Sequence, residues 1–127
     1  MAGKTPEETM HQLIAAFNAG DVDKALSLYH PDGVFVTEPG KLAAGIAEVR
    51  AAFDEFVATQ PALTIEAHET VQAGDIALYC TRWSLSATGP GGSPVSQTGT
   101  GVVVLRQRTD GIWLVAIENP WGADLVR

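Results

Sequence analysis

The sequence has almost no cysteine and few basic residues. Its one cysteine, Cys80, leaves no partner for an intramolecular disulfide, which is typical of a reducing compartment, so we expect a cytoplasmic protein. Eight Lys and Arg residues stand against fifteen Asp and Glu, and the formal net charge is −7. Proteins that bind nucleic acid or anionic membranes present a basic surface. The charge balance therefore argues against both kinds of partner.

Long hydrophobic runs and clusters of metal ligands are also missing. The apolar runs are too short to span a membrane, and the first ten residues lack the apolar segment of a signal peptide. His11, His30 and His68 fall in separate segments without metal-ligand spacing. The glycines at 89–92 lead into no helix and carry no Lys, unlike a phosphate-binding loop. We expect neither a metal nor another cofactor.

The composition that remains is that of a folded domain. Hydrophobic residues make up 46% of the chain and charged residues 18%, which is far from the composition of a disordered chain. A chain of 127 residues can build one hydrophobic core but is short for two domains. We therefore expect a single domain over residues 1–127.

The first half of the chain contains three segments with helical periodicity. Capping residues and apolar spacing predict helices over residues 6–19, 22–29 and 46–59. Between the second and third helices, a turn at residues 30–33 leads into a β-branched and aromatic strand over residues 34–37.

The second half of the chain predicts four strands joined by hairpins. They cover residues 63–71, 76–87, 95–107 and 112–118, and Asp110-Gly111 is a strong hairpin turn. The element order is α-α-β-α-β-β-β-β. It predicts an α+β fold in which a curved antiparallel sheet wraps on three helices and leaves an internal pocket beside them.

Three of these strands are apolar on both faces. Residues 76–80, 102–105 and 113–117 lack the polar alternation of a sheet with one wet face. Three helices can cover only one face, and a large uncovered apolar patch is unusual on a monomer. A second copy covers such a patch with the same surface, so we expect a homodimer through the outer sheet face.

Three stretches resemble a known superfamily. They are Phe17-Asn18-Ala19-Gly20-Asp21, then Leu28-Tyr29-His30-Pro31-Asp32-Gly33-Val34-Phe35, and the ending from Asp110-Gly111-Ile112-Trp113 to Glu118-Asn119-Pro120-Trp121-Gly122. From Pro6 to Gly122 the chain resembles nuclear-transport-factor-2-like (NTF2-like) proteins of the SnoaL-like, DUF4440-type and ketosteroid-isomerase-like branch. The resemblance implies a cone-shaped fold around a pocket.

The same resemblance implies positions for ketosteroid-isomerase chemistry. Its carboxylate base falls at Glu38, but Leu13 stands where a hydroxyl-donating Tyr is expected. The strand over residues 100–106 lacks the second acid. With both oxyanion donors missing, we do not expect steroid Δ-isomerase activity.

Two groups of side chains could carry chemistry. Glu38 is either a base at the pocket mouth or an exposed turn residue. Glu66 and His68 are two apart on one predicted strand and so share a face. They form an acid/base pair if that face lines the pocket and are merely solvated if it does not. His68 is the better candidate because histidine is the side chain suited to proton transfer near neutral pH.

Further side chains could bind a ligand or simply fill the core. The expected pocket walls are Leu13, Phe17, Phe53, Tyr79, Trp83, Asn119 and Trp121. The resulting hypothesis is a protein that binds a small, mainly apolar ligand and performs cofactor-independent acid/base chemistry of isomerase, cyclase or lyase type through Glu38 or His68. The alternative is a non-catalytic ligand-binding or dimerisation module.

Overall fold

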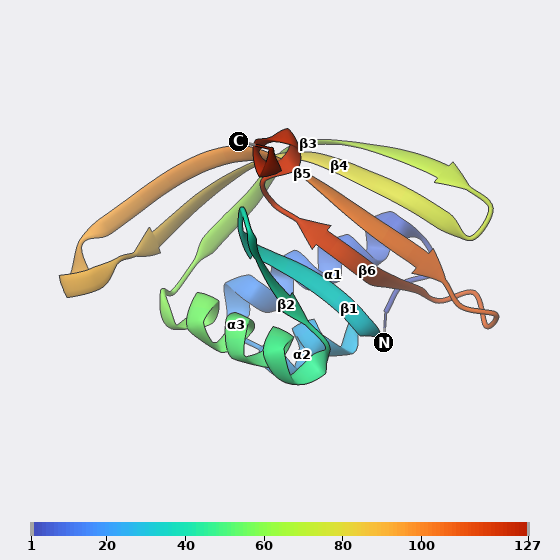
Figure 1. The fold of residues 1–127 in the computed structure, drawn as a ribbon, viewed down its shortest axis with the longest axis horizontal. Helices are drawn as coiled ribbons and strands as arrows, with labels where there is room; N and C mark the ends of the chain where they lie inside the picture. Colours follow the sequence, from blue (N-terminus) through green and yellow to red (C-terminus); the bar gives the residue numbers. More distant parts are fainter. Residues whose placement is uncertain (1, 127) are drawn as a thin grey trace.

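A curved six-stranded sheet arches over three helices in the computed structural model, which describes residues 2–126 (Figure 1). The elements are α1 (Pro6–Ala19), α2 (Val22–Ser27), β1 (Tyr29–Glu38), β2 (Lys41–Ala44), α3 (Ile46–Ala58), β3 (Ala62–Ala73), β4 (Ile76–Thr88), η1 (Pro90–Gly92), β5 (Pro94–Gln107), β6 (Trp113–Asn119) and η2 (Gly122–Leu125). The predicted α+β class and element order are confirmed, and β2 is an additional short strand.

The helix boundaries follow from local capping. Thr5 accepts a hydrogen bond from the Glu8 amide at 3.1 Å, and Gly20 ends α1 with a φ of 70°. Asp21 caps α2 by accepting from the Lys24 amide at 3.0 Å. The helix α2 ends at Ser27, two residues earlier than predicted, because Tyr29 begins β1.

The strand β1 is longer than predicted and includes the expected turn at residues 30–33. It pairs with β6 at Tyr29 and again from Val34, with a register shift between the two points. Gly33 permits this detour, since a Cβ there would lie 2.8 Å from the Tyr29 ring. The β1–β6 pair is parallel, so the sheet is mixed rather than wholly antiparallel as predicted. Hairpin turns join strands that follow one another in the sequence, so the turn signals give no information about the pairing of β1 with β6.

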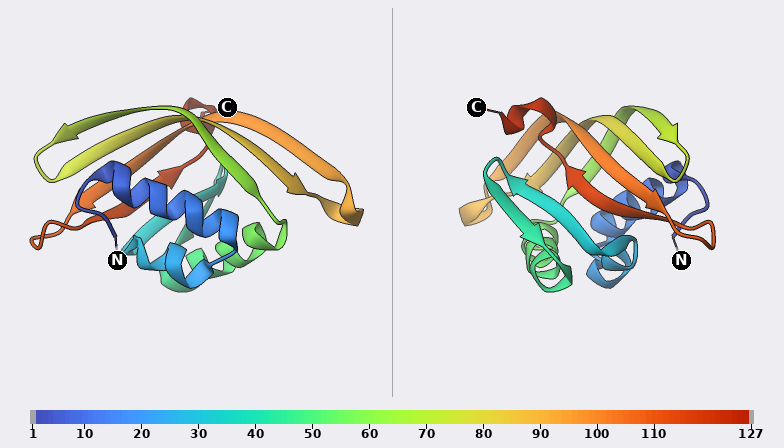
Figure 2. Two further views of the ribbon diagram at one scale, coloured as in Figure 1. Left: turned by 180° about the vertical axis from the view of Figure 1, so that it is seen from behind. Right: turned by 45° about the vertical axis from the view of Figure 1, so that its right-hand side comes forward.

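The strand order is β2-β1-β6-β5-β4-β3, and the helices lie against the concave side of the sheet (Figures 1 and 2). The core between the layers is aromatic: the Phe53 ring meets the Phe17 ring edge-on at 4.9 Å and the Tyr29 ring at 5.2 Å between centroids. The hairpin of β4 and β5 continues past the helices to a tip at η1 (Figure 1). None of the helices in residues 2–126 is long and apolar enough to cross a membrane.

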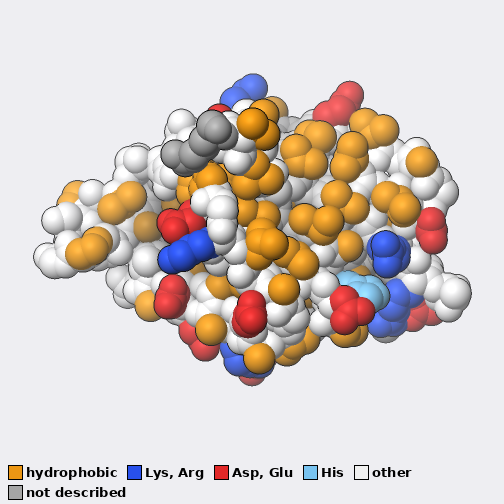
Figure 3. Space-filling view, in the orientation of Figure 1, with side chains coloured by type: hydrophobic (Ala, Val, Ile, Leu, Met, Phe, Trp, Pro, Cys, Tyr) orange, Lys and Arg blue, Asp and Glu red, His pale blue; other side chains and the backbone are white. Residues whose placement is uncertain are grey.

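Apolar side chains also lie on the outer face of the sheet. Strand register places Val71, Leu78, Val104 and Ile117 side by side across β3, β4, β5 and β6. Val71 is 57% exposed, Ile117 43% and Leu78 39%. Hydrophobic atoms are also gathered on the side of the molecule shown in Figure 3. We call these four residues the outer apolar row.

Candidate functional site

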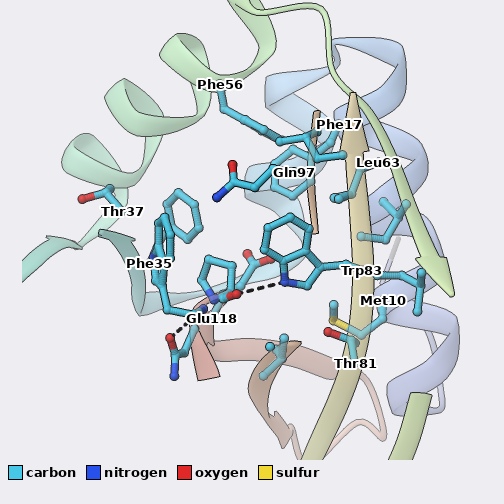
Figure 4. A pocket seen from close by; sticks show the side chains of 18 residues that line it. Met10, Phe17, Phe35, Thr37, Phe56, Leu63, Thr81, Trp83, Gln97 and Glu118 are labelled. Atoms are coloured by element: carbon cyan, nitrogen blue, oxygen red, sulfur yellow. Dashed lines mark hydrogen bonds between the residues drawn. The ribbon is translucent and has the colours of Figure 1, made fainter. Parts of the chain in front are cut away.

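A cavity of about 230 Å³ lies between the concave face of the sheet and the helices α1 and α3 (Figure 4). Its lining is mainly apolar and includes five of the nine aromatic side chains in the chain, which are Phe17, Phe35, Phe56, Trp83 and Trp121. Neutral polar groups come from Thr37, Thr81, Gln97 and Asn119. Glu118 is the one titratable side chain that residues 2–126 contribute to the lining.

The Glu118 side chain is buried, with 8% of the residue exposed. The buried Tyr29 hydroxyl donates a hydrogen bond to Glu118 Oε1. Burial raises the pKa of Glu118 to about 7, because the apolar surroundings disfavour the carboxylate, while the hydrogen bond from Tyr29 acts in the opposite direction. Burial and the neighbouring carboxylate also raise the pKa of Tyr29 well above its usual value, so Tyr29 remains a donor.

A β-bulge turns Glu118 toward the cavity. The strand β6 pairs Val115 with Leu105 and Ile117 with Val104, which leaves Ala116 as an extra residue. Val115 faces the core, whereas Ile117, two residues on, faces outward and is 43% exposed. The next residue, Glu118, therefore points inward beside Val103.

The segment after β6 contributes Pro120 and Trp121 to the wall of the cavity. Trp83 donates its Nε1 hydrogen to the Pro120 carbonyl at 2.9 Å, and Trp121 donates its own to the Val36 carbonyl at 3.0 Å. Gly99 leaves room for the first indole, since a Cβ there would lie 2.6 Å from Trp83 Cζ2. Both tryptophans are thereby fixed in the cavity wall.

Four of the seven predicted wall residues line the cavity, and three do not. Phe17, Trp83, Asn119 and Trp121 contribute to the lining. Leu13, Phe53 and Tyr79 lie in the core with no exposed surface and are absent from the lining. Apolar periodicity identifies both groups as inward-facing and cannot separate a wall from a filled core.

Both predicted proton-transfer residues lie outside the cavity lining. Glu38 is exposed at the end of β1, and its carboxylate lies 3.5 Å from Lys41 Nζ. His68 is exposed and stacks on the Tyr79 ring at 5.0 Å between centroids. Among residues 2–126, the titratable side chain that lines the cavity is Glu118 and neither Glu38 nor His68.

Glu66 and His68 do not form the expected pair either. The register shift between Ile65 and Ala67 makes Glu66 a bulge residue. Its carboxylate accepts a hydrogen bond from Ser84 at 2.7 Å, away from the ring on which His68 stacks. The bulge thus removes the shared face that strict alternation predicts.

The sequence contained one signal for Glu118: it is the only charged residue in the apolar segment 112–118. Strict alternation along this strand places Trp113, Val115, Ile117 and Asn119 on one face and Glu118 on the other. Within residues 2–126, no group of three or more His, Cys, Asp or Glu side chains is placed to hold a metal ion.

Comparison with known proteins gives a family match over most of the chain. A family model described as a SnoaL-like domain matches residues 10–115. No curated protein matches significantly.

Solved structures share the fold at low sequence identity. An NTF2-like superfamily protein from Salmonella enterica has 15% identity and a TM-score of 0.79, covering 88% of this chain and 84% of the other. A ketosteroid isomerase-like protein from Erwinia carotovora has 24% identity and a TM-score of 0.75, covering 88% of each chain. A protein from Catenulispora acidiphila in complex with S-DNPA has 19% identity and a TM-score of 0.73, covering 88% and 86%.

Proposed function

Because this chain belongs to the SnoaL-like domain family and has the NTF2-like fold, we propose that it binds a small, mainly apolar metabolite in the cavity. We also propose that Glu118 transfers a proton to or from this metabolite. The observation that carries the proposal is a buried carboxyl, with a pKa raised to about 7, at the wall of an aromatic cavity. A titratable group perturbed in this way in a cavity is a typical mark of a functional site.

The geometry favours acid/base chemistry without a cofactor. At neutral pH a carboxyl with a pKa near 7 is present both as an acid and as a base. The Tyr29 hydroxyl donates a hydrogen bond to Glu118 Oε1, and no group within residues 2–126 donates one to Glu118 Oε2. The carboxylate can take a proton from a carbon next to a carbonyl and return it at another position, as an isomerase or cyclase of this type requires.

The size of the cavity limits the ligand. Its volume of about 230 Å³ falls below the roughly 300–1,000 Å³ of cavities that bind drug-sized molecules. The aromatic walls favour a cyclic and largely hydrocarbon body. A monocyclic or bicyclic compound is the best fit.

Proton exchange tests the catalytic part of the proposal. The purified protein is incubated with 2-methylcyclohexanone in D₂O at neutral pD, and loss of the α-proton signal is followed by NMR. We expect the protein to accelerate exchange and the variant Glu118→Gln to lose the acceleration. The matched control is Glu66→Gln, which removes an exposed carboxylate on the outer side of the sheet. Equal rates with Glu118→Gln and the unmodified protein would contradict the role of Glu118.

A second candidate function is a non-catalytic ligand-binding module. It is favoured by the lack of any second titratable side chain in the cavity lining. In that case the cavity binds its ligand, and the protein gives no exchange above the buffer rate with any ketone that it binds.

We further propose that two copies pair through the outer apolar row. This surface is continuous across four strands and partly exposed, and one twofold contact would cover it on both copies. Light scattering at micromolar concentration should give the mass of two chains. Leu78→Lys at the centre of the row should give one chain, whereas the control Ile46→Lys, which charges an exposed residue on α3, should leave the mass unchanged. A single-chain mass for the unmodified protein would refute the pairing.

A further inference from the structure

The Glu118 carboxyl faces the cavity without a cationic partner from residues 2–126. Among residues 2–126, no Lys, Arg or His lines the cavity. The three ion pairs within residues 2–126 all join other residues, namely Lys41–Glu38, Arg50–Asp23 and Arg108–Asp110. Buried charges in proteins are normally paired, and a carboxylate left unpaired in an apolar site is costly. The cavity therefore has a place for a positive charge that the described part of the chain does not supply.

The walls around this carboxyl also favour a cation. The electron-rich faces of aromatic rings attract positive charge, and Trp attracts it most strongly. Phe35 is the strand partner of Glu118, and in Figure 4 Phe35 and Trp83 lie on either side of it. The hydrogen bonds of Trp83 and Trp121 to backbone carbonyls hold both indoles in place, so a ligand need not order them.

The charge of the whole chain acts in the same direction. A formal net charge of −7 creates a negative potential that attracts cations and repels anions. No basic side chain from the residues that the structure describes lines the cavity and opposes this field. A carboxylate or phosphate ligand would meet repulsion both during approach and inside the cavity.

We propose that the ligand of this cavity is a small hydrophobic amine, bound as its ammonium form. The ammonium group donates a hydrogen bond to the free oxygen of Glu118, and the hydrocarbon body fills the space between the aromatic walls. The inference rests on the proposed function only in placing the ligand in this cavity, and it does not require that the protein be an enzyme.

This binding mode gives a definite pH dependence. Within residues 2–126, Tyr29 on β1 is the one titratable group hydrogen-bonded to Glu118. Tyr79 on β4 lies one strand further from Glu118 than Tyr29 does, and it interacts electrostatically with Glu7 of α1. No charged residue of α1 or α3 lines the cavity. Glu118 therefore titrates without a charged neighbour, around a pKa of about 7 in the free protein.

Because the ammonium binds the ionised form of Glu118, affinity should rise about tenfold between roughly pH 6 and pH 8, while an aliphatic amine with a pKa near 10 stays protonated throughout. A neutral ligand of the same shape gains nothing from the ionisation of Glu118. Its affinity should stay level or fall over the same range.

The test compares cyclohexylmethylamine with cyclohexylmethanol, two probes of nearly the same shape that differ in charge. NMR titration of the ¹⁵N-labelled protein measures both dissociation constants near pH 6 and pH 8. We expect the amine to bind about tenfold more tightly than the alcohol at the higher pH. Glu118→Gln should abolish this preference, and Glu66→Gln should keep it. The amide spectrum of each variant also shows whether it is folded.

Each other outcome overturns the amine inference. Equal binding of the two probes, or an amine preference that survives in a folded Glu118→Gln variant, shows that Glu118 does not select a cation. If the alcohol alone binds, the cavity retains its proposed ligand-binding function and only the amine inference fails. If neither probe binds, the amine inference fails, and the ketone exchange assay decides separately whether the proposed proton transfer fails.

Discussion

The substitution Glu118→Gln should change how the stability of the protein depends on pH. The pKa of Glu118 is about 7 in the folded state, against an ordinary value of 4.5 that applies when the chain is unfolded. Between these two values the unfolded chain has released its proton, while the folded protein still holds it. Stability contributed by a raised pKa is fully present below the lower value and is lost as the pH rises through the higher one.

The magnitude follows from the size of the shift. A difference of one pKa unit corresponds to about 1.36 kcal/mol, so Glu118 should lower the free energy of unfolding by about 3 kcal/mol between roughly pH 4.5 and pH 8. The Gln side chain does not titrate in this pH range, and its carbonyl oxygen can still accept the hydrogen bond from Tyr29. Relative to the unmodified protein, Glu118→Gln should therefore gain about 3 kcal/mol over the same interval.

Urea unfolding at a fixed protein concentration, repeated at several pH values, measures this difference. The comparison uses the change of stability with pH, so a constant packing cost of the substitution cancels. Glu66→Gln serves as the control because Glu66 is exposed on the outer side of the sheet, and its curve should run parallel to that of the unmodified protein. If the Glu118→Gln curve is also parallel to that of the unmodified protein, burial does not raise the pKa of Glu118 as the structure indicates.

Two further substitutions test the framework around the cavity. Gly99→Ala should lower the free energy of unfolding by about 1–3 kcal/mol in urea, because the added Cβ would lie 2.6 Å from the Trp83 indole and displace it; unchanged stability would mean that the indole is not fixed over this strand. Thr9→Val should cost about 2 kcal/mol in thermal or urea unfolding, because the buried Thr9 hydroxyl donates to the Trp113 carbonyl at 2.8 Å and accepts from the Gly3 amide at 3.0 Å; a neutral effect would show that water replaces both bonds.

The fold could be predicted from the sequence because its signals are local. The cap at Thr5, the left-handed stop at Gly20 and the turn at Asp110-Gly111 each depend on a few adjacent residues. The element order then restricts the architecture. The parallel pairing of β1 with β6 was outside this reasoning, because it joins segments at opposite ends of the chain.

The site was less predictable because two bulges break the alternation on which face assignment depends. One extra residue at Ala116 turns Glu118 inward, and one at Glu66 separates Glu66 from His68. A bulge leaves no composition signal in either segment. The charge of Glu118 within an apolar strand was the one available clue, and its meaning depended on the backbone around it.

The strand β3 is the last in the order of the sheet, so its outer edge pairs with no other strand within residues 2–126. At Leu63 the Asn18 side chain of α1 occupies this edge, donating to the Leu63 carbonyl at 2.9 Å and accepting from the Leu63 amide at 2.7 Å. An open edge can recruit strands from other copies and start aggregation, unless charge or irregular backbone blocks it. The bulge at Glu66 interrupts this edge, and the exposed acidic side chains of Glu66 and Glu69 would face the same charges on a second copy. Growth of a continuous sheet from molecule to molecule is therefore disfavoured. A twofold contact through the outer apolar row would end at two chains and leave this edge in water.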